Sequence, residues 1–232
     1  MILYLDIYMS FIDIHTHHLP TGDDVVAILN VIVGENSQHA DRGDCYLSYG
    51  LHPWNIESAG ERMERLRLLV EGDRVVAIGE AGLDRLAESP IESQIPIFIS
   101  QAELAESVAK PLIIHCVKAW DELLAIKKRM RPSQPWIIHG FRGNGVMAAQ
   151  LLRQGFYLSF GRRHNPDALR AAWPDCLFLE SDEEDINIGD LYAEVANKLN
   201  IPLADFKGQV SRNCSIFNLF RYDLIQIYFT PF

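Results

Sequence analysis

Residues 111–139 set out one complete strand–helix–strand unit, PLIIHCVKAWDELLAIKKRMRPSQPWIIH. Residues 111–115 and 136–139 are short apolar runs rich in isoleucine, and residues 120–131 between them carry apolar side chains at helical spacing. Two such runs joined by a helix predict parallel strands connected by a right-handed crossover. The unit therefore predicts an α/β fold with a parallel sheet.

The same alternation continues on both sides of this unit. It predicts six further strands, at residues 11–17, 25–33, 45–50, 75–80, 156–161 and 177–182. It also predicts helices at residues 61–70, 94–109, 144–154, 165–173 and 191–200. Eight strands in 232 residues match a TIM-type (β/α)8 barrel, trimmed in its first βα units because the connections at 18–24 and 34–44 are short or polar. An open, doubly wound sheet is the alternative fold.

The composition is typical of an ordinary globular protein. Hydrophobic residues make up 48% of the chain and charged residues 22%, which excludes disordered and fibrous proteins. No low-complexity tract or linker divides the sequence, so we expect one domain over residues 1–232. The aromatic segment 221–232, RYDLIQIYFTPF, is expected to be a C-terminal extension that covers part of the barrel or a partner subunit. We expect a monomer or a small homo-oligomer.

The cysteines, the N-terminus and the net charge restrict the compartment and the partners. The four cysteines form no CxxC pair, which favours a reducing compartment. The apolar N-terminus lacks the basic region of a signal peptide, and no run approaches eighteen apolar residues, so we expect a cytoplasmic protein without membrane spans. The net charge of −10 excludes a protein that coats nucleic acid by charge alone, but it permits an enzyme that binds a few phosphates.

Residues able to bind a metal ion stand where the predicted strands end. His15 and His17 are two positions apart on one strand, so their side chains point the same way. In a barrel the carboxyl ends of all strands lie on one rim, where active sites are found. The residues that would converge there are His15, His17, Glu80, His115, His139 and Asp182. Four imidazoles and two carboxylates exceed what one tetrahedral ion needs and suit a pair of divalent cations.

Seven motifs occur in a fixed order along the chain: FIDIHTHH, GLHPW, AIGEAGLD, PLIIHC, IHGFRG, LSFG and LESD. In these motifs the chain resembles the TatD family of metal-dependent deoxyribonucleases, which belongs to the amidohydrolase-like barrel superfamily. The resemblance runs from about residue 11 to residue 220. One motif alone is weak, but the ordered set is specific.

The resemblance implies a role for each predicted ligand. The implied ligands are His15, His17 and Asp182 for one metal ion, His115 and His139 for the second, and Glu80 as the bridge between the two. Asp182 would also act as the general base, so Asp182 and the bridging Glu80 are the expected catalytic residues.

The resemblance also implies the reaction and its partner. A hydroxide that bridges two divalent metal ions would attack a phosphodiester bond of DNA or of a nucleotide substrate, in a 3′–5′ exonuclease. We expect Mg or Mn in activity, and Zn or Ni as bound ions because imidazole-rich sites favour them. Two alternatives stay open. One is a hydrolase of a small ester, lactone or amide in the same superfamily, and the other is a catalytically silent metal-binding scaffold.

Two positions depart from the pattern of the family. Val117 stands where the family usually has an arginine, two positions after the histidine of the fifth strand, and Trp54 stands where it often has a histidine. Phosphate contacts are therefore expected from cationic side chains just past the strand ends. These are Arg85, Lys118, Arg142, Arg162 and Arg163.

Four more residues on or near the predicted rim have an expected role. Trp54 and Trp120 present aromatic faces that could stack a nucleobase or pack against neighbouring loops. Asp13 and His52 are expected to orient the metal ligands from behind or to belong to the core.

Overall fold

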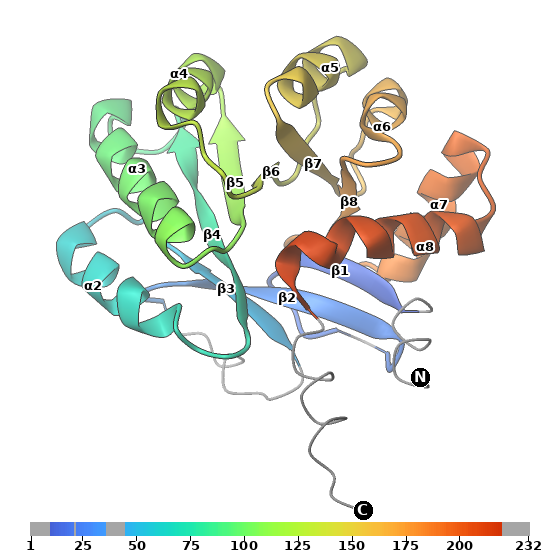
Figure 1. Cartoon of the computed structure of the whole chain (residues 1–232), viewed down its shortest axis with the longest axis horizontal. Helices are drawn as coiled ribbons and strands as arrows, with labels where there is room; N and C mark the ends of the chain where they lie inside the picture. The colour runs from blue at the N-terminus through green and yellow to red at the C-terminus, as the bar shows by residue number, and fades with distance from the viewer. Residues whose placement is uncertain (1–9, 21, 36–44, 220–232) are drawn as a thin grey trace, which may run out of the picture.

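The computed structural model describes residues 10–20, 22–35 and 45–219, and its eight strands form one sheet in the order of the sequence (Figure 1). Each neighbouring pair of strands is parallel. The strands are β1 (Phe11–Thr16), β2 (Val25–Ile32), β3 (Tyr46–Gly50), β4 (Val75–Asp84), β5 (Leu112–Val117), β6 (Trp136–Ile138), β7 (Phe156–Phe160) and β8 (Leu177–Leu179). The predicted eight-stranded parallel fold is confirmed.

The sheet closes on itself between β1 and β8. Thr16 and Asp182 form a parallel bridge there. The backbone N–H of His17 donates to the carbonyl of Asp182 at 3.0 Å, and the N–H of Asp182 donates to the carbonyl of His15 at 2.9 Å. These contacts make the sheet a barrel and exclude the open, doubly wound alternative. They also bring three of the predicted metal ligands to one seam.

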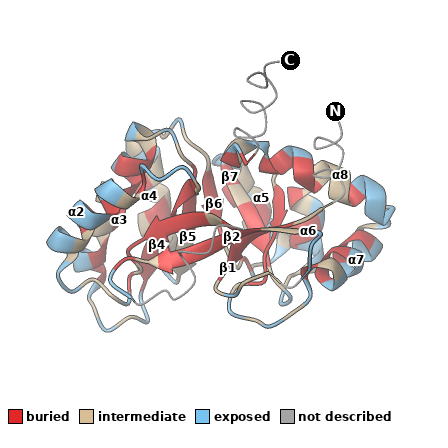
Figure 2. Ribbon diagram, turned by 90° about the horizontal axis from the view of Figure 1, so that it is seen from below, coloured by how far each residue is buried: buried red, intermediate tan, exposed pale blue. Residues whose placement is uncertain are grey.

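Helices cover the outside of the barrel, while the strands lie buried at its centre (Figure 2). Helix α3 packs against β4, helix α5 against β7, and helices α7 and α8 against β1 and β8. The helices are α2 (Ala59–Leu69), α3 (Ile91–Ser107), α4 (Trp120–Met130), α5 (Gly145–Arg153), α6 (Pro166–Ala172), α7 (Ile188–Leu199) and α8 (Leu203–Asn213), and a 3₁₀ turn, η1 (Cys214–Phe217), follows them.

Helix α7 illustrates why these segments form helices on the outside. The side chain of Asn187 accepts a hydrogen bond from the N–H of Gly189 and so caps the first turn. Buried side chains then recur three and four positions apart, which gives the helix one apolar face. They are Ile188, Leu191, Tyr192, Val195 and Ala196. This face packs against β1 and β8, and the helix begins three residues before the predicted start.

The sequence pattern predicts no helix at residues 203–213, where the structure has α8. The segment LADFKGQVSRN carries only Leu203, Phe206 and Val210 as large apolar residues, and Gly208 interrupts it, so its helical signal is weak. Tertiary packing supplies what the local pattern lacks. Phe206 is fully buried and stacks on Trp173, with the ring centroids 5.2 Å apart.

Strand β4 is longer than predicted, and Glu80 lies inside it rather than at its end. The predicted strand stops at Glu80 because an ionisable residue ends an apolar run, yet pairing with β5 continues as far as Asp84, opposite Val117. Gly82 makes this pairing possible, since a Cβ at its position would lie 2.0 Å from the carbonyl oxygen of His115. His115 likewise lies within β5, not at its end as predicted.

The connection from β1 to β2 contains no helix in its described residues, 17–20 and 22–24, as expected for a trimmed first βα unit. Within the described residues the first helix is α2, which follows β3. The connection at 36–44 and the predicted extension at 221–232 lie outside the described residues. No helix in the described part of the chain is long and apolar enough to cross a membrane.

Candidate metal centre

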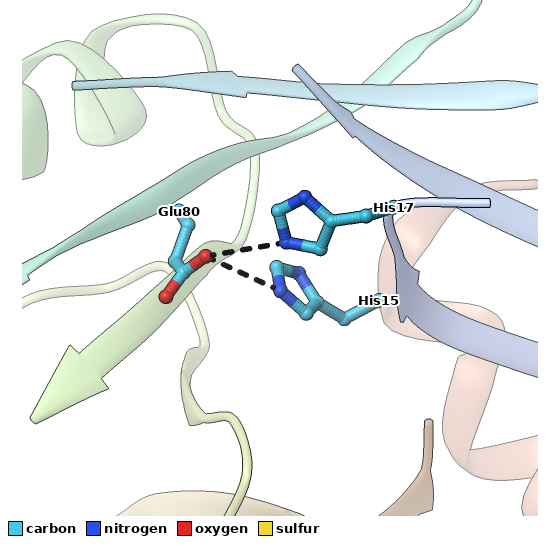
Figure 3. Close-up of side chains that lie close together, drawn as sticks. All are labelled: His15, His17 and Glu80. Carbon is cyan, nitrogen blue, oxygen red and sulfur yellow. Dashed lines mark ion pairs between the residues drawn. The ribbon is translucent and has the colours of Figure 1, made fainter. Parts of the chain in front are cut away.

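The buried carboxylate of Glu80 lies at the centre of a group of imidazoles. Its Oε2 is 3.4 Å from Nε2 of His15 and 3.7 Å from Nε2 of His17, and both rings point toward it (Figure 3). His15 lies within β1 and His17 directly follows it. Since side chains two positions apart on a strand share a face, β1 directs both rings to the same side.

The other oxygen of Glu80 faces a second set of imidazoles. Oε1 lies 2.7 Å from Nδ1 of His115, 2.7 Å from Nε2 of His139 and 3.4 Å from Nε2 of His52. His115 comes from β5, His139 directly follows β6, and His52 comes two residues after β3. Each carboxylate oxygen of Glu80 thus has its own group of nitrogen donors.

Asp182 completes the cluster from the seam between β8 and β1. Its Oδ1 lies 3.7 Å from Nε2 of His15 and 3.8 Å from Nε2 of His17. The side chain is 27% exposed and lines a cavity of about 700 Å³ that opens over the cluster. Asp182 therefore joins the group around His15 and His17 and faces the pocket as well.

Two further carboxylates lie behind the second set of imidazoles. Oε1 of Glu180 is 3.3 Å from Nδ1 of His139 and accepts a hydrogen bond from the N–H of Gly140 at 2.6 Å. Oδ2 of Asp84 is 3.1 Å from Nε2 of His115. A carboxylate on the far nitrogen of an imidazole fixes the tautomer and the orientation of the ring. Glu180 and Asp84 therefore hold these two rings with their other nitrogen turned toward Glu80.

Polar side chains from the barrel wall fix the backbone and the carboxylate at the centre. The side-chain oxygen of Asn30 accepts from the N–H of Glu80 at 2.8 Å, and its amide nitrogen donates to Oε2 of Glu80 at 3.4 Å. Asp13 accepts a hydrogen bond from the hydroxyl of Ser181 at 2.6 Å and one from the N–H of His15 at 3.3 Å. Asn30 thus holds Glu80, while Asp13 links the β8 side of the seam to the backbone of His15.

The cluster shifts the pKa values of its members. Burial raises the pKa of Glu80, but the charge of His139 and hydrogen bonds from His115 and His139 outweigh it and hold that pKa well below its usual range. Burial lowers the pKa of His139, but the charges of Glu80 and Glu180 outweigh it and raise that pKa well above the usual value. Glu80 is therefore ionised, and its charge favours a proton on the ring of His139.

The donor atoms fit a divalent cation. Both ring nitrogens of the fully buried His15 have no hydrogen-bond partner among the described residues, although a buried polar atom of this kind is normally paired. A cation would satisfy Nε2, which faces Glu80 and Asp182, and imidazole with carboxylate is a donor set that divalent transition metals favour. Groups with all donor atoms within 4.8 Å of one another are His15, His17 and Glu80; His15, His139 and Asp182; and His52, Glu80 and His115.

The sequence model of one protein family, described as TatD related DNase, matches residues 12–213 of the chain. The chain belongs to this family. The match runs from β1 to the end of α8, so it contains the whole barrel and every residue of the cluster. The family resemblance found in the ordered motifs is confirmed.

Curated relatives of this TatD-family chain match it over part of its length. The "3′-5′ ssDNA/RNA exonuclease TatD" of Cronobacter turicensis is 34% identical over 175 residues, which cover 68% of this chain and 64% of that protein. The protein of the same name from Erwinia billingiae is 40% identical over 105 residues, 44% of this chain and 40% of that protein. The "Uncharacterized metal-dependent hydrolase YabD" of Bacillus subtilis is 35% identical over 119 residues, which cover 50% of this chain and 47% of that protein. The chain thus matches less than two thirds of the length of these relatives.

Solved structures of TatD proteins share the fold. YjjV, a TatD homologue from Escherichia coli, superposes with a TM-score of 0.78 at 22% identity, over 90% of this chain and 98% of that one. A TatD-family hydrolase from Entamoeba histolytica superposes with a TM-score of 0.73 at 18% identity, over 92% of this chain and 98% of that one. These likenesses confirm the predicted barrel.

The six predicted ligands of this TatD-family chain come together, and His52 joins them. His52 is expected to orient ligands or to belong to the core, and its Nε2 reaches Oε1 of Glu80 while its Nδ1 accepts the backbone N–H of Trp54. His52 lies in a short loop after β3, where no strand or helix periodicity applies, so the sequence does not predict which way its ring points. Trp120 packs its ring edge-on against Phe141, with the centroids 6.4 Å apart, and does not line the cavity.

The cationic residues predicted to contact phosphate do not line the cavity over the cluster. Arg85 forms an ion pair with Glu122 of α4, and Arg163 forms one with Glu184 at 3.4 Å. A place just past a strand end fixes the backbone of a residue but not the direction of a long side chain. The full set, all exposed, is Arg85, Lys118, Arg142, Arg162 and Arg163.

Three residues of the site are missing from the sequence prediction: Asn30, Asp84 and Glu180. Each carries a signal in the sequence, because each is a polar or acidic residue within or directly beside an apolar strand, in VVAILNVI, VVAIGEAGLD and LFLESD. Asn, Asp and Glu in such runs are rarely buried without a partner. The signal marks them as partnered, but only the folded chain shows that the partners are Glu80 and the imidazoles around it.

Proposed function

We propose that the chain is a divalent-metal-dependent hydrolase that cleaves phosphodiester bonds and removes nucleotides from the 3′ end of single-stranded DNA or RNA. The observation that carries this proposal is the buried carboxylate of Glu80, which has imidazole donors against each of its two oxygens. Membership of the TatD-related DNase family supports the class of reaction. The exonuclease names of the relatives from Cronobacter and Erwinia support the substrate.

The division of donors around Glu80 supports a pair of ions. In this proposal the first ion takes its ligands from the side of Oε2, where Asp182 also lies, and the second from the side of Oε1. Glu80 would be the ligand that the two ions share, because imidazoles lie against each of its oxygens. The ligands would be His15, His17 and Asp182 for the first ion and His115 and His139 for the second. The Nδ1 of His52 accepts the backbone N–H of Trp54, so its Nε2 carries the proton and would donate to Glu80 rather than bind an ion.

The residues of the chain divide the chemistry among them. Divalent cations held in this cluster would lower the pKa of a water molecule to about 7 and neutralise charge on a phosphoryl oxygen. Asp182 accepts the proton of the attacking water, because its carboxylate faces both the cavity and the cluster. Glu180 and Asp84 keep the rings of His139 and His115 in one orientation throughout.

The donor set also indicates which ions bind. Imidazole nitrogens favour Zn or Ni in affinity, so we propose that the purified protein carries one of these. Mg and Mn prefer oxygen donors and exchange readily, and we propose that either supports turnover. Elemental analysis of the purified protein measures the number and kind of bound ions.

A labelled strand tests the reaction. Purified protein with Mg or Mn is incubated with a single-stranded oligonucleotide labelled at its 5′ end, and a ladder that shortens from the 3′ end is expected. Glu80→Gln, which keeps the size but removes the bridging charge, should abolish the ladder. Glu103→Gln, an exposed position on α3, is the matched control and should leave it unchanged.

The same variants separate the alternatives. If the strand stays intact while a small ester, lactone or amide is hydrolysed and Glu80→Gln abolishes that reaction, the nuclease proposal is wrong and the chain is a hydrolase of another ester class. If metal binds but the protein hydrolyses neither the oligonucleotide nor any small ester, lactone or amide, the chain is a metal-binding scaffold.

A further inference from the structure

The cavity over the cluster has an unusual charge for a site that binds nucleic acid. Its lining contains no lysine or arginine among the described residues. Four exposed glutamates line it instead, in addition to the two carboxylates of the cluster: Glu35, Glu57, Glu88 and Glu183. Arg62 comes near this wall, but its Nη1 donates to the backbone carbonyl of Asn55 at 2.8 Å and is not turned to the cavity.

This charge distribution limits how a strand can be held. Proteins that bind along a strand neutralise successive phosphates with lysine and arginine, and most of their affinity comes from these contacts. Here a phosphate at the cluster can be balanced by bound cations, but any phosphate placed near the outer wall would face glutamate. The cavity therefore favours one phosphate at the cluster and disfavours an extended polyanion across its outer part.

An aromatic ring offers a different contact in the same cavity. Trp54 is 60% exposed and lines the cavity beside Leu86, which is also 60% exposed. The indole is fixed in place, because its Nε1 donates to Oδ2 of Asp84 at 2.5 Å and its backbone N–H donates to Nδ1 of His52 at 3.2 Å. A ring tied at its nitrogen keeps its face free, and such a face stacks nucleobases without regard to sequence.

We infer that the cavity recognises a single terminal nucleotide unit, with the reacting phosphate at the cluster and the nucleobase against Trp54, and that it makes no contact with phosphates further along the strand. The inference rests on the proposed function and narrows its substrate: very short oligonucleotides are bound and cut as well as long strands. The cavity volume of about 700 Å³ lies within the range of small-molecule sites.

Binding of a dinucleotide tests the role of the ring without relying on turnover. A thymidine dinucleotide with a hydrolysis-resistant phosphorothioate link is titrated calorimetrically into the wild-type protein with Mg. Trp54→Ala should weaken binding roughly 5- to 150-fold, the range measured for loss of one stacked base. Trp54→Phe keeps an aromatic face but lacks the N–H that donates a hydrogen bond to Asp84. It should bind the dinucleotide much more tightly than Trp54→Ala does. If Trp54→Phe binds as weakly as Trp54→Ala, the stacking role is wrong.

Chain length and salt test the absence of further phosphate contacts. The wild-type kcat/KM per 3′ end should be nearly equal for the thymidine dinucleotide and for a strand of about 20 nucleotides, and should change little between 50 and 200 mM salt. A site with six to ten phosphate contacts would lose roughly 10³- to 10⁵-fold over that range. Glu57→Lys with Glu88→Lys should create a preference for the long strand and a salt dependence. Glu103→Lys on α3, away from the cavity, should create neither.

The outcomes separate this inference from the proposed function. A wild-type protein that cuts the long strand far better than the dinucleotide, with a steep salt dependence, keeps the proposed function and overturns the inference. A wild-type protein that cuts neither substrate overturns the proposed function. In that case the calorimetric titration still shows whether Trp54 holds a nucleotide unit.

Discussion

Glu180 lies directly behind His139, with its Oε1 3.3 Å from Nδ1 of the ring, while Nε2 of the same ring lies 2.7 Å from Glu80. The imidazole is therefore held between two carboxylates, one at the centre of the cluster and one fully buried in the barrel wall. Such a pair fixes the tautomer of a metal-binding histidine.

Replacing this second carboxylate should weaken metal binding without removing a ligand. We expect Glu180→Gln to lower the affinity for the ion at His139 by roughly 10- to 100-fold, because the neutral amide no longer holds the ring as strongly. Competition titration with a chelator measures the dissociation constant. Glu194→Gln, at an exposed position on α7, is the control and should bind the ion as the wild type does. Equal affinities in wild type and Glu180→Gln would contradict the positioning role.

Metal binding should also stabilise the fold. The donors come from strands far apart in the sequence, so the unfolded chain does not assemble them. Zn at about 100 times its dissociation constant should raise the free energy of unfolding by about 2.7 kcal/mol for each site. Chemical denaturation with Zn and with a chelator measures the difference. In Glu80→Gln, Zn should raise the free energy of unfolding much less. An equal rise in the wild type and in Glu80→Gln would mean that the ions bind at another site.

Helix α8 should contribute to stability through one ring. Phe206 is fully buried, stacks on Trp173 and meets Tyr192 edge-on, with the centroids 5.5 Å apart. Phe206→Ala should lower the free energy of unfolding by about 3–5 kcal/mol through lost burial and a residual cavity. Leu203→Ala on the same helix, at a position that is partly exposed, should cost less than about 1 kcal/mol. Denaturant unfolding measures both, and similar losses would mean that α8 packs loosely.

The barrel could be predicted from the sequence because each strand–helix unit repeats the same local pattern, as residues 111–139 show. The cluster could be predicted because the carboxyl ends of parallel strands share one rim. The position of His15, His139 and Asp182 at or near a strand end was therefore enough to place them together. Helix α8 and the true end of β4 could not, since Phe206 and Glu80 owe their burial to distant partners.

The orientation of long side chains and of loop residues could not be predicted from the sequence either. Arg85 turns to Glu122 and not to the cavity, while His52 turns its ring toward Glu80 from a loop. Loop backbones and long flexible side chains have no periodicity that fixes their orientation, so their positions follow from the packing of the whole barrel.

Lys127 should make the stability of the protein depend on pH in an alkaline window. Its ammonium lies 4.5 Å from the ring centroid of Phe156 and 4.9 Å from that of Trp136, and burial lowers its pKa from 10.5 to about 8. Between these two values the unfolded chain binds more protons at this residue than the folded chain does. The contribution of Lys127 to the free energy of unfolding therefore rises with pH from about 8 to 10.5 and is flat on either side.

The difference between wild type and Lys127→Met isolates this effect, because all other titrating groups cancel. Denaturant unfolding at several values between pH 7 and pH 10.5 should show the wild type gaining stability relative to Lys127→Met as the pH rises. Lys128→Met, at the exposed neighbouring position, should keep a constant difference from the wild type. A constant difference for Lys127→Met as well would mean that attraction to the two aromatic rings offsets the effect of burial, and that the ammonium keeps its ordinary pKa.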